Sequence, residues 1–139
     1  EGYRLPTGGI QQGEAVMATL AREIMEETGQ PVAGAAADWS RAVGVERCLG
    51  IVAYTLRHDT LGDISFATYH FLVRMPTTGV LDPQDADEQI AGWRWLPVAH
   101  LPAVAATLAH VGASHPDWAD WGRFRAISHR FVAARLLAG

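Results

Sequence analysis

Apolar and polar residues follow two different periods along this chain, which predict helices near both ends and strands between them. Residues 14–28 carry apolar side chains at helical spacing. Gly29 and Pro31 are expected to end this helix, the first as a left-handed cap and the second as a breaker. The glycine-rich residues 5–13 are predicted to form the loop before it.

Two stretches in the middle of the chain predict strands. Residues 42–57 alternate for part of their length, which indicates one long strand or two short ones. A Gly-Asp turn within residues 58–63 leads to residues 64–75, whose aromatic and β-branched side chains are typical of a strand. A further short strand is predicted at residues 89–96.

The C-terminal part of the chain is predicted to be helical. Residues 98–111 indicate a short helix that contains Pro102, and residues 117–137 an amphipathic one. We expect an aromatic stripe on the second helix to pack either into the core or against a second copy of the chain. The second case would be a homodimer. The stripe consists of Trp118, Trp121, Phe124, Ile127 and Phe131, and the remaining stretches, 32–40 and 76–88, are predicted loops.

Composition narrows the class of protein. The 139 residues fit one domain, and 49% hydrophobic with 19% charged residues argue against disorder. A net charge of −4 gives no basic footprint for a nucleic acid polymer, and no apolar run approaches the roughly 20 residues of a membrane span. The only cysteine, Cys48, excludes a disulfide framework, fits a cytoplasmic location, and is expected to be buried in its strand. All 11 basic residues are arginines, so chemistry that needs a lysine is excluded.

Acidic residues gather in the helix predicted at residues 14–28. Because successive helical residues advance by roughly 100°, Glu23, Glu26 and Glu27 share one face. Like charges at this spacing repel, and the helix dipole adds to the cost near the C-terminal end. A divalent cation would offset the repulsion, and magnesium suits a few carboxylates together with substrate phosphates. On its own, the pattern also fits a solvated acidic helix face.

The residues around these acids resemble the Nudix box. That motif runs glycine, five residues, glutamate, seven residues, Arg-Glu, an aliphatic residue, any residue, Glu-Glu, any residue, glycine and an aliphatic residue. The matching stretch is 8–30, with Gly8, Glu14, Arg22-Glu23, Ile24, Glu26-Glu27 and Gly29 at the fixed positions, preceded by Leu5-Pro6-Thr7. Gln30 replaces the last aliphatic residue, a departure that concerns helix-end packing more than chemistry.

The resemblance implies an α+β fold, the Nudix-type α/β/α sandwich with a mixed sheet. Residues 1–139 would form a single Nudix domain, with the box at 8–30 and a C-terminal helical extension from about 98 to 139. The family fold places strands before the box, and this chain has almost no residues for them. We therefore expect either a fragment of a longer protein or a sheet that is completed differently.

The resemblance also implies a function. Nudix hydrolases use magnesium or manganese to cleave a diphosphate linkage in a nucleoside diphosphate joined to another group, with water attacking phosphorus. Glu26 and Glu27 would be metal ligands, and Glu23 would be a ligand or the general base that activates water. Arg22 would orient Glu23 through a charge-assisted bond. Structural support would come from Gly8, Gly9, Glu14 and Gly29, with Arg22 as one route for Glu14.

Two further metal ligands are implied less directly. The backbone carbonyl of Thr7 would complete the coordination, and Glu88 would be the additional acid that some members supply from a later loop. A solvated loop charge is the other reading of Glu88. Val45 to Cys48 carry neither the ADP-ribose nor the diadenosine-polyphosphate cue of the family, so the substrate and its binding residues are not identified.

Two other functions compete with hydrolysis. The first is a non-catalytic Nudix-like module that senses or binds a nucleotide, although such modules usually have a degraded box and this one is intact. The second is an interaction domain that pairs through its C-terminal aromatic helix. The hydrolase is favoured because every acid of the box is present. A small nucleotide-type substrate is expected as its partner, and neither a nucleic acid polymer nor a membrane.

Overall fold

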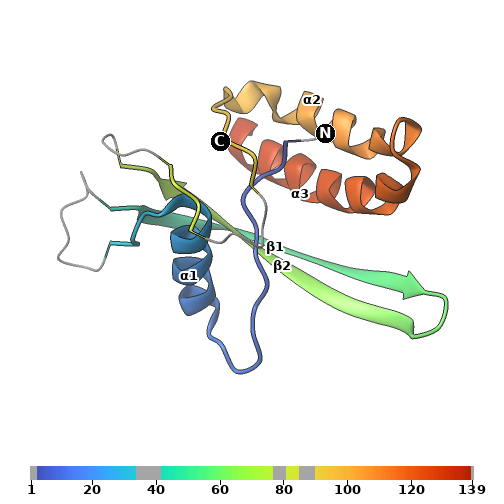
Figure 1. Cartoon of the computed structure of the whole chain (residues 1–139), viewed down its shortest axis with the longest axis horizontal. Helices are drawn as coiled ribbons and strands as arrows, with labels where there is room; N and C mark the ends of the chain where they lie inside the picture. The colour runs from blue at the N-terminus through green and yellow to red at the C-terminus, as the bar shows by residue number, and fades with distance from the viewer. Residues whose placement is uncertain (1–2, 34–41, 77–80, 85–89, 139) are drawn as a thin grey trace. The chain divides into compact units, whose positions relative to one another are not determined.

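The computed structural model describes residues 3–33, 42–76, 81–84 and 90–138. These residues form three α-helices, short 3-10 helices and a two-stranded antiparallel sheet, so the predicted α+β class is confirmed (Figure 1). The chain divides into two compact units, and the prediction of a single domain stays a prediction. The first unit contains residues 1–5, 48–70 and 95–139, and the second contains 6–47 and 71–94.

Helix α1 (Val16–Thr28) belongs to the second unit and follows the glycine-rich loop. It begins two residues later than predicted, because Gln11 and Glu14 close a turn in which the Glu14 amide donates to the Gln11 carbonyl at 2.9 Å. It ends at Gly29, as predicted, with φ of 69° and a hydrogen bond from the Gly29 amide to the Met25 carbonyl. Glycine adopts this left-handed conformation without the steric cost of a side chain.

A short segment, residues 82–84, is bound to the C-terminal end of α1, and we call it the 82–84 strap. The Asp82 amide donates to the Thr28 carbonyl at 3.0 Å, and the Gln84 amide donates to the Glu26 carbonyl at 2.6 Å. A Cβ atom on Gly29 would lie 2.5 Å from the Asp82 carbonyl oxygen, so the strap needs glycine there. The strap satisfies carbonyl groups that a helix end otherwise leaves without partners.

Strands β1 (Gly44–His58) and β2 (Gly62–Arg74) form a long hairpin, which confirms the two central strands. Within the second unit, the Arg74 guanidinium binds the Glu46 carboxylate across the two strands at 2.9 Å. One parallel bridge joins Val32 to Val43 beside the start of β1.

The short strand predicted at residues 89–96 is wrong for the described part of that stretch. Residues 90–96 have no regular secondary structure. Trp95 is 72% exposed, so the alternating apolar positions do not face a core. A strand needs a neighbouring strand for its backbone hydrogen bonds, and none of the described strands supplies one here.

Two helices form the core of the first unit. They are α2 (Leu101–Ala109), which has Pro102 in its first turn, and α3 (Ala119–Leu137). Leu108 is fully buried between them. At Gly122 the helices approach closely, because an added Cβ would lie 2.2 Å from the Leu108 carbonyl oxygen. The 3-10 helices η1 (Val98–His100), η2 (Val111–Ala113) and η3 (Pro116–Trp118) complete this part of the chain.

Aromatic side chains of α3 pack on the outer part of the hairpin. The Phe124 ring meets the Tyr54 ring edge-on at 5.1 Å, and the Phe131 ring lies 4.8 Å from His70. The predicted aromatic stripe is therefore core in part, while Trp118 and Ile127 remain exposed. A homodimer through α3 stays a prediction.

Cys48 is exposed, so the expectation that it is buried is wrong. Its neighbour Leu49 takes the buried position, and successive strand side chains point to opposite sides. Among the described helices, none is both long and apolar enough to cross a membrane.

Two histidines of the first unit, His129 and His70, are buried. The Leu5 amide donates to Nε2 of His129 at 3.0 Å, and Nδ1 of His129 lies 2.9 Å from the Arg125 carbonyl, so the hydrogen is assigned to Nδ1. Burial lowers the pKa of His129. Burial also lowers the pKa of His70, and the backbone of Gly50 and Thr68 opposes this only in part.

We expect the free energy of unfolding to fall as the pH drops below about 6.5. The unfolded chain, whose histidines have a pKa of about 6.5, takes up protons there that the folded chain resists. The loss is at most about 1.4 kcal/mol per pH unit for each histidine. Urea denaturation between pH 7.5 and 5.5 measures it. His129→Gln should flatten the dependence, whereas His100→Gln, at an exposed position, should not. A stability that rises towards acid would contradict the prediction.

Candidate functional site

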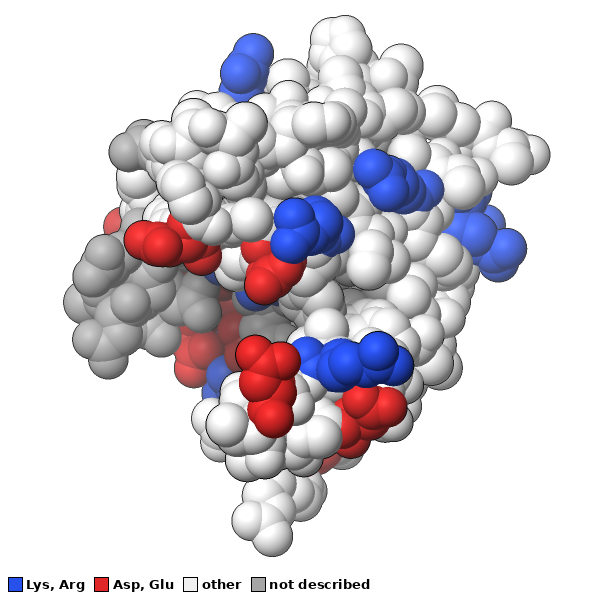
Figure 2. All heavy atoms as spheres, turned by 90° about the vertical axis from the view of Figure 1, so that its right-hand side faces the viewer, with Lys and Arg blue, Asp and Glu red and all other residues white. Residues whose placement is uncertain are grey.

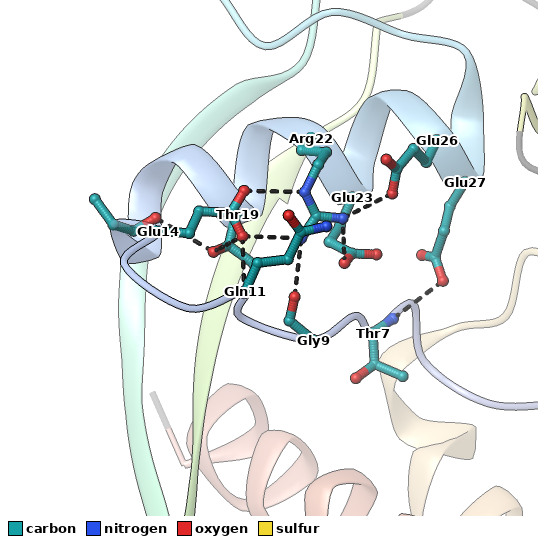
Figure 3. A network of polar contacts seen from close by, with 10 residues as sticks. Thr7, Gly9, Gln11, Glu14, Thr19, Arg22, Glu23, Glu26 and Glu27 are labelled. Carbon is teal, nitrogen blue, oxygen red and sulfur yellow. Dashed lines mark hydrogen bonds and ion pairs between the residues drawn. The ribbon is translucent and has the colours of Figure 1, made fainter.

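The guanidinium of Arg22, a half-buried side chain of α1, is the centre of a network of carboxylates in the second unit (Figure 3). Its Nε and Nη2 donate to the two oxygens of Glu14, both at 2.9 Å, and Nη2 also donates to the Gly9 carbonyl at 2.8 Å. Its Nη1 donates to Glu23 at 2.7 Å and to Glu26 at 2.9 Å. All five N–H groups of the guanidinium are thus engaged, which fixes the side chain from several directions.

Glu14 connects the glycine-rich loop to the helix. One of its oxygens accepts from the Thr19 hydroxyl at 2.8 Å and from the Gln11 amide at 3.1 Å. Hydrogen bonds from Arg22, then from Gln11 and Thr19, lower the pKa of Glu14 to about 2. The same pairing raises the pKa of Arg22. Glu14 therefore stays ionised and anchors the guanidinium.

Thr19 was not among the residues predicted for the site. Its side chain is buried in α1, although threonine is polar, and it also donates to the Ala15 carbonyl. Thr19 lies four residues before Glu23 and seven before Glu26, so helical geometry places it on the same face as these acids, and this spacing is the signal that could have identified it.

Gly8 makes room for the carboxylate of Glu23. A Cβ atom on Gly8 would lie 1.6 Å from Cδ of Glu23, so any other residue would occupy the space that this carboxylate fills. The side chain of Glu23 is 14% exposed, and Nη1 of Arg22 also binds its carboxylate. The glycine thus shapes the cradle in which the acid lies.

Glu27 points towards the loop and is 2% exposed (Figure 3). The Thr7 amide donates to its Oε1 at 3.3 Å. This contact involves the amide of Thr7, and the ligand role expected for the Thr7 carbonyl stays a prediction. Glu88 lies outside the described residues. At the helix end, Gly29 admits the 82–84 strap beside the backbone of Glu26, and its supporting role at the site stays a prediction.

The residues fit a divalent cation in donor chemistry and in charge. Glu14, Glu23 and Glu26 carry three formal negative charges against one on Arg22, which leaves two unbalanced within a partly buried cluster. Carboxylate oxygens are ligands that magnesium prefers. The arrangement differs from a formed site, because Glu23 and Glu26 turn to Arg22. In the described part of the chain, no three acid, histidine or cysteine side chains already group around a metal position.

Comparison with known proteins gives one match. A family model described as the NUDIX domain matches residues 1–121, which is most of the chain and includes the whole network around Arg22. Residues 122–139, which form most of α3, lie beyond the match. Searches of curated proteins and of solved structures find no match.

Proposed function

Since the chain belongs to the NUDIX domain family, whose members are in general pyrophosphohydrolases of nucleoside diphosphate derivatives, we propose that it is a metal-dependent diphosphate hydrolase. Its substrate would be a nucleoside diphosphate linked to another group, with water attacking phosphorus. The observation that carries the proposal is the cluster of Glu14, Glu23 and Glu26 around one arginine.

Three carboxylates of α1 and the arginine have distinct roles in this proposal. Magnesium or manganese, when bound, would neutralise the phosphate charge and lower the pKa of water. Glu26 and Glu27 would hold the ion. Glu23 would either hold it as well or accept the proton of the attacking water, and its bond to Arg22 orients it.

A small nucleotide derivative suits this chain better than a nucleic acid polymer. The net charge is −4. On the face shown in Figure 2, several arginine side chains lie beside acidic side chains. A polymer of phosphates is bound by a continuous basic surface. We expect the protein to act in the cytoplasm, on the reasoning from its single cysteine.

The test is hydrolysis of a panel of nucleoside diphosphate derivatives, including ADP-ribose and diadenosine polyphosphates. We expect products with magnesium, loss of turnover with a chelator, and recovery when magnesium is restored. In ¹⁸O-labelled water, the label should enter one phosphate product, and its position identifies the phosphorus that is attacked. Binding of a nucleotide without products would favour the sensing module, and no products from any compound would contradict the hydrolase.

Gly8→Ala is expected to lower kcat by about 100-fold, the usual cost of misplacing a catalytic group by about 1 Å. The new Cβ would occupy the place of the Glu23 carboxylate, which is the flexible end of its side chain and can move without unfolding the protein. Steady-state kinetics and a thermal melt measure the two effects. Gly9→Ala is the matched control, because nothing lies within 4 Å of an added Cβ there. Equal losses of kcat in the two variants would contradict the role of Gly8 in making room for Glu23.

A further inference from the structure

One nitrogen of Arg22 is shared by two of the carboxylates that the proposed function assigns to metal. Nη1 lies 2.7 Å from Oε1 of Glu23 and 2.9 Å from Oε2 of Glu26. A positively charged N–H group therefore occupies the space between the facing oxygens. A cation bound by those same oxygens would need this space, because magnesium–oxygen distances are about 2.1 Å.

We propose that Nη1 of Arg22 is an internal counter-ion, which a divalent cation must displace from Glu26 in order to bind. The inference rests on the proposed function and adds to the orienting role of Arg22. Removal of the guanidinium should then strengthen metal binding while it weakens hydrolysis. An arginine that only oriented Glu23 would leave metal affinity unchanged or lower it.

Such an exchange would break only one contact of the guanidinium. The Nε and Nη2 groups are held by Glu14 and by the Gly9 carbonyl, neither of which takes part in the contact with Glu26. Nη1 can lose one partner while the rest of the guanidinium stays in place. Glu26 is also the most exposed of the three carboxylates, with 34% of its side chain accessible, so it can turn most easily. Glu14 consequently determines how strongly the Arg22 guanidinium competes with a cation for Glu26.

The experiment measures binding of Mn²⁺ alone, from the electron paramagnetic resonance signal of the free ion, at about 0.5 M NaCl. At this salt concentration the screening length is about 4 Å, so the contribution of distant exposed charges is small. Arg22→Gln should bind Mn²⁺ about tenfold more tightly than the parent, the factor for one charge-assisted hydrogen bond that no longer has to break. Arg57→Gln, which removes an equal charge at an 89% exposed site, should match the parent.

Each result is decisive. Equal or weaker binding by a folded Arg22→Gln protein would overturn the inference and leave the proposed function intact. If the parent binds no Mn²⁺, the proposed function fails and the inference fails with it. Circular dichroism shows whether the variant folds.

Glu14→Gln provides a second route if Arg22→Gln does not fold. It keeps Arg22 but removes the anchor, so the guanidinium should bind Glu23 and Glu26 more strongly and weaken Mn²⁺ binding several-fold. Glu46→Gln is its matched control, because Glu46 is also paired with an arginine, Arg74. Unchanged or tighter binding by Glu14→Gln relative to this control would overturn the inference.

Discussion

Glu26→Gln is expected to lower kcat by about 100-fold or more while the protein stays folded. Glutamine has the shape of glutamate, and its carbonyl oxygen can still accept the hydrogen bond from Nη1 of Arg22. The variant therefore removes a charge rather than a side chain. Loss of one preorganised electrostatic group typically costs about 100- to 1,000-fold in kcat. Steady-state hydrolysis of any diphosphate that the parent cleaves measures the effect.

Glu46→Gln serves as the control for this variant too. It makes the same chemical change in a carboxylate that binds Arg74 on the hairpin, outside the network around Arg22. Its turnover should equal that of the parent. Unchanged hydrolysis by Glu26→Gln, with thermal stability close to that of the parent, would remove Glu26 from the proposed mechanism.

Gly122→Ala is expected to destabilise the protein, although alanine is the better helix former. In an ordinary helix interior this change would stabilise by up to about 1 kcal/mol. Here the new methyl group would lie 2.2 Å from the Leu108 carbonyl oxygen and 2.3 Å from Cγ1 of Val111. Backbone atoms cannot turn away as a side chain can, so the helices must separate, at a cost of about 1–3 kcal/mol. Urea denaturation gives the free energy of unfolding.

Ala134→Gly measures the propensity term separately. Ala134 is exposed on the same helix, so the change should lower stability by about 1 kcal/mol through helix propensity alone. If Gly122→Ala instead raised stability by a similar amount, the close approach of α2 and α3 at Gly122 would be wrong.

Local signals in the sequence account for most of the predicted elements. The periodic apolar positions and Gly29 defined α1 to within two residues, because helix ends depend on neighbouring residues. The central hairpin followed in the same way from two β-rich stretches and a short turn. The strand predicted at residues 89–96 was wrong because strand formation depends on a partner that the local pattern does not reveal.

For the candidate site, the sequence indicated which residues are important, but not which hydrogen bonds each of them makes. The spacing of Glu23 and Glu26 placed them on one face, but their common bond to one nitrogen of Arg22 depends on side-chain rotamers. The bond between Leu5 and His129 joins residues 124 positions apart, so no local pattern could predict it.

The 82–84 strap has a consequence for how this protein can change over evolutionary time. Its two bonds to α1 come from the amides of Asp82 and Gln84, and every amino acid except proline can supply them. The side chains at these two positions can therefore change while both hydrogen bonds to the helix remain. The invariant demand falls instead on Gly29, where any side chain would collide with the Asp82 carbonyl. The sequence requirement that the strap creates would thus fall on Gly29, more than fifty residues earlier in the chain.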